Sequence, residues 1–171
     1  MLAFTLVIVL TTAFPSEADA SHWFGYKWRS APVGLTLIDA TTGDWPGIVA
    51  RAAAQWNVSS AVEFVIKRGP CQPKMNAVVI CNANYGAGVA SFARLSINRL
   101  IIRGAVIQIN DYYYGPQTYI EGRWAVTCQE LGHTLGLDHD PSALGGPYSC
   151  MGWGWQPGPH DYEQLLLIYG P

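Results

Sequence analysis

Charged side chains are scarce in this 171-residue chain, at 13% of all residues, whereas an average soluble protein has about 25%. The chain also lacks a run of basic residues and any alternation of basic and aromatic residues, the usual features of a nucleic-acid-binding surface. Half of its residues are apolar, and seven Trp and nine Tyr supply amphipathic surface in place of charge. The composition therefore argues against nucleic acid as a partner and allows one domain with a sizeable core.

No apolar stretch is long enough to cross a bilayer comfortably, and the longest one, residues 2–14, lies at the N-terminus. The small residues Ala18 and Ala20 then form a cleavage pattern. We therefore predict a secretory signal over residues 1–20 and one secreted, extracellular domain over residues 21–171. No Lys or Arg precedes the apolar stretch, so an uncleaved anchor is the alternative. Cleavage removes two of the twelve acidic residues and no base, which leaves a nearly neutral chain without stable membrane association.

The residues suited to bind a metal are concentrated in one short segment, residues 128–140. If this segment is helical, Gln129 and His133 lie one turn apart on the same face, and Glu130 lies on their flank. Two such side chains can hold a small cation, while a neighbouring carboxylate takes a proton from water. Gly136 can end the helix in a left-handed conformation, which lets His139 return to the same ion as a third ligand. The segment therefore predicts a metal-dependent hydrolase.

This spacing resembles the signature H-E-x-x-H-x-x-G-x-x-H of the metzincin metallopeptidases. Together with the Cys150-Met151 segment and with His160-Asp161-Tyr162 at the start of the last expected helix, it makes nearly the whole mature chain most similar to the matrixin-like secreted proteins of bacteria. Every fixed position of the signature matches except the first, where Gln129 replaces histidine. An amide oxygen is a poorer zinc ligand than an imidazole nitrogen, so this replacement lowers the expected affinity. The resemblance implies a zinc-dependent endopeptidase in which Gln129, His133 and His139 hold Zn²⁺ and Glu130 is the catalytic general base.

The resemblance also implies an α+β fold. We expect a metzincin-like twisted mixed sheet of about five strands with an antiparallel edge strand, a backing helix, an active-site helix, a methionine turn at Met151 and a C-terminal helix. Hydrophobic periodicity and turn residues predict these elements: strands over residues 33–39, 62–67, 77–82 and 105–111, and helices over residues 45–57, 121–135 and 159–170. Residues 86–93 are consistent with either a strand or a bulged loop. The apolar residues of 95–103 fit neither the helical nor the strand periodicity.

The strand from Ala105 to Asp111 precedes the site helix, and in metzincins the strand at this place in the order lies at the sheet edge. An open edge can accept a protein or peptide substrate as an added strand through main-chain hydrogen bonds. We therefore expect the substrate along this strand, on a monomeric enzyme. Calcium sites cannot be read from the sequence.

Four cysteines in an exported chain predict two disulfides, for which three connectivities exist. We favour Cys71 with Cys81, which would staple a turn containing Gly and Pro. The other pair, Cys128 with Cys150, would tie the first turn of the site helix to the segment carrying Met151. A zinc site made of all four cysteines is the competing interpretation, but the usual C-x-x-C pairs are absent.

Two other functions compete with catalysis. Gln129 favours a catalytically lapsed pseudo-peptidase that acts as an extracellular protein-binding or peptide-binding module. Glu130 argues against it, because a binding module has no need of this carboxylate beside His133. A purely structural extracellular domain that acts through its Trp and Tyr side chains is the third hypothesis.

Overall fold

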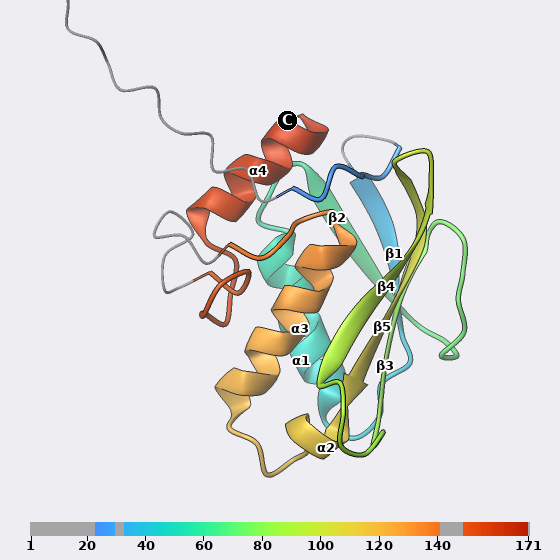
Figure 1. Ribbon diagram of the computed structural model, residues 1–171, viewed down its shortest axis with the longest axis vertical. Helices are drawn as coiled ribbons and strands as arrows, with labels where there is room; N and C mark the ends of the chain where they lie inside the picture. The colour runs from blue at the N-terminus through green and yellow to red at the C-terminus, as the bar shows by residue number, and fades with distance from the viewer. Residues whose placement is uncertain (1–22, 30–32, 141–148, 171) are drawn as a thin grey trace, which may run out of the picture.

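The computed structural model describes residues 23–29, 33–140 and 149–170. The predicted signal over residues 1–20 lies outside the described residues. The elements follow one another in the order strand, helix, four strands and three helices (Figure 1): β1 Val33–Asp39, α1 Trp45–Trp56, β2 Val62–Arg68, β3 Ala77–Ala83, β4 Ser91–Asn98, β5 Ile101–Asn110, α2 Asp111–Tyr114, α3 Ile120–Thr134 and α4 Pro159–Tyr169.

The five strands form one sheet in the order β2-β1-β3-β5-β4. Four of them are parallel, and β4 runs antiparallel to β5 at one edge. Helices α1 and α3 lie side by side on one face of this sheet (Figure 1), and the main core fills the space between them and the strands. This architecture confirms the predicted metzincin-like α+β fold.

The predicted edge strand is wrong. Residues 105–111 mostly belong to β5, which lies inside the sheet between β3 and β4. On this side the sheet ends at β4, which a two-residue turn joins to β5, and β2 forms the opposite edge. Both turn residues, Arg99 and Leu100, have positive φ angles of 48° and 66°, as the tightest hairpin turns require. Asn or Gly usually marks such a turn, so Arg99 and Leu100 carry no signal for this hairpin.

The two preferred disulfides are present, Cys71–Cys81 and Cys128–Cys150. The second one starts from the middle of α3, not from its first turn, because the helix already begins at Ile120. Asp44 precedes α1 but makes no side-chain cap. Its carboxylate instead accepts two hydrogen bonds of 2.6 Å from the buried guanidinium of Arg123 on α3.

Helix α4 buries Leu165, Ile168 and Tyr169 in the core, whereas Leu166 is 39% exposed. None of the helices in the described ranges is both long and apolar enough to cross a membrane.

Residues 23–29, which we call the N-terminal arm, run across the end of α3. Trp28 anchors the arm, because its buried indole Nε1 donates a 2.8 Å hydrogen bond to the carbonyl of Thr134. Lys27 connects the arm to β5 through a backbone bridge with Ile101 and a 2.8 Å hydrogen bond from the amide of Ile102 to its carbonyl. The arm therefore contacts both the site helix and the β4–β5 hairpin.

Candidate active site

The two predicted histidine ligands converge at the end of α3. Gly136 follows the helix with a φ angle of +92°, the left-handed conformation that favours glycine. The amide of Leu137 returns to the carbonyl of Gly132 over 3.2 Å, which closes the reversal. As a result, the Nε2 atoms of His133 and His139 lie 3.0 Å apart.

The hydrogen bonds of His133 assign its protons. Its Nδ1 atom lies 2.8 Å from the carbonyl oxygen of Leu137. A carbonyl only accepts hydrogen bonds, so Nδ1 carries a proton, and in the neutral ring Nε2 then carries the lone pair that a metal would take. This arrangement of a backbone carbonyl on the outer ring nitrogen is typical of a metal-binding histidine. Two Nε2 ligands of one tetrahedral zinc ion would lie about 3.3 Å apart, given Zn–N distances of about 2.0–2.1 Å. The observed separation is close to this value.

Glu130 lies buried beside the histidine pair, with 4% of its surface exposed. Its Oε1 atom accepts a 2.6 Å hydrogen bond from the hydroxyl of Ser91 on β4. Its buried Oε2 atom has no hydrogen-bond partner among the described residues. Burial raises the pKa of Glu130 to about 7, although the hydroxyl of Ser91 and the amide of Ala93 lower it. A carboxyl group with this pKa and one unpartnered oxygen is suited to accept and return a proton near neutral pH.

A groove of about 670 Å³ exposes this chemistry along the edge strand β4. Gln129, Glu130, His133 and His139 all line the groove, so the structure brings together the four side chains predicted for the centre of the site. No group of three His, Cys, Asp or Glu side chains is placed to hold a metal in the described part of the chain. A third protein ligand beside the histidine pair would therefore fall to the partly buried amide of Gln129.

Met151 packs against the site helix α3 at Gly132. It is fully buried in a turn that a 3.0 Å hydrogen bond from Gly152 to Ser149 closes. A Cβ atom added at Gly132 would collide with Sδ of Met151 and would lie 2.8 Å from the ring of Trp56. The methionine therefore packs directly against the backbone of α3, as predicted for a methionine turn, and the Cys128–Cys150 disulfide fixes it there.

Sequence reasoning missed the groove residues that come from other elements, and four of them have side chains close to the predicted centre or on the N-terminal arm. Ser91 lies 39 residues before Glu130 and belongs to no motif. Tyr114 lines the groove from α2, and burial together with the charge of Glu130 raises its pKa. Phe24 and Tyr26 line it from the N-terminal arm. Only the aromatic content of the arm and of residues 112–114 could have suggested these contacts.

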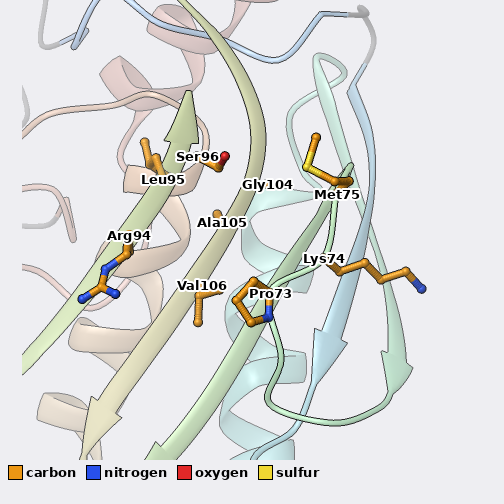
Figure 2. A pocket seen from close by; sticks show the side chains of 9 residues that line it. All are labelled: Pro73, Lys74, Met75, Arg94, Leu95, Ser96, Gly104, Ala105 and Val106. Carbon is orange, nitrogen blue, oxygen red and sulfur yellow. The ribbon is translucent and has the colours of Figure 1, made fainter. Parts of the chain in front are cut away.

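A second cavity of about 210 Å³ lies on the face of the sheet away from the helices (Figure 2). Val106 and Pro73 line its centre, whereas the charged ends of Arg94 and Lys74 point away from it. Among the described residues, no His, Cys, Asp or Glu lines this cavity, whereas the groove along β4 contains two histidines and a glutamate, so the groove is the candidate active site.

Comparison with known proteins supports the fold. No protein-family model matches the chain, and no curated protein matches its sequence. A solved structure of myroilysin superimposes with a TM-score of 0.55 and 13% sequence identity, over 85% of this chain and 96% of that one. At this level of identity the likeness establishes the fold alone.

Proposed function

We propose that the chain is a secreted, zinc-dependent endopeptidase. The observation that carries this proposal is the arrangement at the end of α3. Two histidine Nε2 atoms lie 3.0 Å apart, and a buried carboxyl group with a pKa of about 7 lines the same groove. The groove follows an open strand edge, where an extended polypeptide can bind.

His133, His139 and Gln129 would hold the zinc ion. Zinc bound at such a site polarises the scissile carbonyl and lowers the pKa of water. Glu130 would take the proton of the attacking water and pass it to the leaving amine. Its Oε2 atom has no partner within the described residues, which leaves it available for this transfer. The hydroxyl of Ser91 holds the other oxygen in place.

The substrate would lie along β4 as an added strand. One side of β4 pairs with β5, and the other side faces the groove. Its outward backbone groups can therefore hydrogen-bond an extended chain of any sequence. The two disulfides support secretion, because such bonds persist in oxidising compartments.

A catalytically lapsed binding module is the second candidate. Gln129 favours it, because no third His, Cys, Asp or Glu side chain joins the histidine pair within the described ranges. Such a protein would keep the groove along β4 and bind peptides without cutting them.

Hydrolysis of a fluorescently labelled unfolded protein tests the proposal. We expect residues 21–171 to cleave it in the presence of zinc and to lose this activity in a chelator. Glu130→Gln preserves the shape of the side chain but removes the base, so it should reduce kcat by roughly 10²- to 10⁴-fold. Peptide binding without cleavage in the parent would contradict the peptidase and support the binding module.

A further inference from the structure

We propose that Phe24 and Tyr26 of the N-terminal arm form the wall of a substrate subsite, which selects aromatic or large aliphatic side chains on one flank of the cleaved bond. This inference rests on the proposed function, because it assigns specificity to the same groove. It concerns residues that lie more than a hundred positions before Glu130 in the sequence.

The two aromatic rings form a continuous surface next to the histidine pair. The rings of Phe24 and Tyr26 stack, with centroids 5.4 Å apart and an angle of 17° between their planes. Phe24 also contacts the imidazole of His133, at 5.8 Å between centroids. Phe24 lines the groove with 39% of its surface exposed. A partly exposed ring in a groove can bury further apolar surface only when a ligand covers it.

The arm is held rigidly enough to act as a wall. The amide of Phe24 donates a 2.9 Å hydrogen bond to the carbonyl of Gly136, and the indole of Trp23 donates one of 2.8 Å to the carbonyl of Tyr26. A Cβ atom at Gly136 would collide with the carbonyl oxygen of Tyr26. The arm therefore packs against the same turn that brings the two histidines together.

The position of the wall along β4 identifies the part of the substrate that it contacts. Glu130 is hydrogen-bonded to Ser91 near the start of β4, and the amide of Ala93 also interacts with it. The residues of β4 that line the groove beyond this point include Leu95 and Ile97. These residues are two and four positions beyond Ala93, or roughly 7 and 13 Å at the usual rise of a strand.

The pairing direction then determines the flank. A chain added antiparallel to β4, which is the commoner pairing, would place residues on the amino side of the cleaved bond over Leu95 and Ile97. We therefore expect the wall to read the side chains roughly two to four residues before that bond. Both the wall and the strand offer apolar side chains there, because Phe24, Tyr26, Leu95 and Ile97 line the same groove. The amide of Lys27, next to Tyr26, donates a 2.9 Å hydrogen bond to the carbonyl of Leu100 in the β4–β5 turn, which brings the arm to this end of β4.

The test compares cleavage profiles of a degenerate peptide library between the parent and Phe24→Ala. We expect the parent to prefer aromatic and large aliphatic residues at the second to fourth positions before the bond. Phe24→Ala should lower kcat/KM for these peptides by roughly tenfold and leave peptides with small residues there unchanged. Phe24→Leu should restore most of the preference, which separates lost contact from lost folding. Met75→Ala is the control, because Met75 is 60% exposed and lines the cavity on the other face (Figure 2).

The outcomes separate this inference from the proposed function. An unchanged profile in Phe24→Ala, or a change confined to positions after the bond, would overturn the inference and leave the peptidase intact. If neither the parent nor any of these variants cleaves a peptide of the library, the proposed function fails. Binding of the same peptides to Glu130→Gln, with and without Phe24→Ala, then decides the inference: weaker binding of peptides with aromatic residues supports the subsite, and equal binding overturns it.

Discussion

The Nε2 atoms of His133 and His139 lie 3.0 Å apart, although the two residues are six positions apart and the end of a helix lies between them. The reversal at Gly136 accounts for this geometry, because its positive φ angle turns the chain back on α3. The carbonyl of Leu137, which lies within the turn, fixes the ring of His133. The turn therefore both brings the histidines together and orients one of them.

Burial of Glu130 should make the stability of the metal-free protein depend on pH. Its pKa is raised from an ordinary value of 4.5 to about 7, so the folded state binds more protons than the unfolded state between these values. Stability should therefore fall as the pH rises through this window. Glu130→Gln removes the effect and should be more stable than the parent at pH 8, by up to about 3 kcal/mol, but not at pH 4. Urea unfolding at both pH values measures this, and a constant difference would contradict the assignment.

Packing of α3 on Met151 predicts opposite effects of alanine at two glycines. Gly132→Ala should destabilise the protein by about 1–3 kcal/mol, because the added Cβ collides with Met151 and crowds Trp56. Gly122→Ala in the same helix meets only Thr118, at 3.5 Å, so the better helix propensity of alanine should stabilise it by up to about 1 kcal/mol. Thermal unfolding of both variants provides the comparison. Equal effects would mean that Met151 does not pack tightly on the helix.

The two disulfides should differ in their effect on the site. They close loops with sequence separations of 10 and 22 residues, so replacing either pair by serine should cost about 3 kcal/mol of stability. Only the Cys128–Cys150 pair joins α3 to the methionine turn, so only its removal should also weaken zinc binding. Competition with a chromophoric chelator measures the affinity. Loss of affinity in the Cys71–Cys81 variant would show instead that general destabilisation is responsible.

Local patterns predicted most of the fold. The strand over Val33–Asp39 has the predicted bounds, because β-branched residues and Leu lie between clear turn signals. The β4–β5 hairpin was missed because Arg99 and Leu100 adopt positive φ angles that their side chains disfavour. Because this turn was missed, β5 was predicted as the edge strand, whereas β4 pairs along its outer side and forms the edge.

The candidate site was predictable only where it is local in the sequence. Gln129, Glu130 and His133 are neighbours on one helix, so their spacing alone placed them together. The hydrogen bond from Ser91 and the stacking of Phe24 near His133 depend on how distant segments pack. No periodicity encodes such contacts. The residues at the centre of the site could therefore be predicted from the sequence. Those that hydrogen-bond Glu130 or line the groove around it could not.

The most direct test of the central claim is the zinc content and affinity of residues 21–171, compared with His133→Ala and Gln129→His. We predict one zinc ion per chain in the parent, none in His133→Ala, and binding roughly tenfold or more tighter in Gln129→His, because imidazole is the better ligand. Zinc binding that persists in His133→Ala, or its absence from both the parent and Gln129→His, would contradict a metal site at the end of α3.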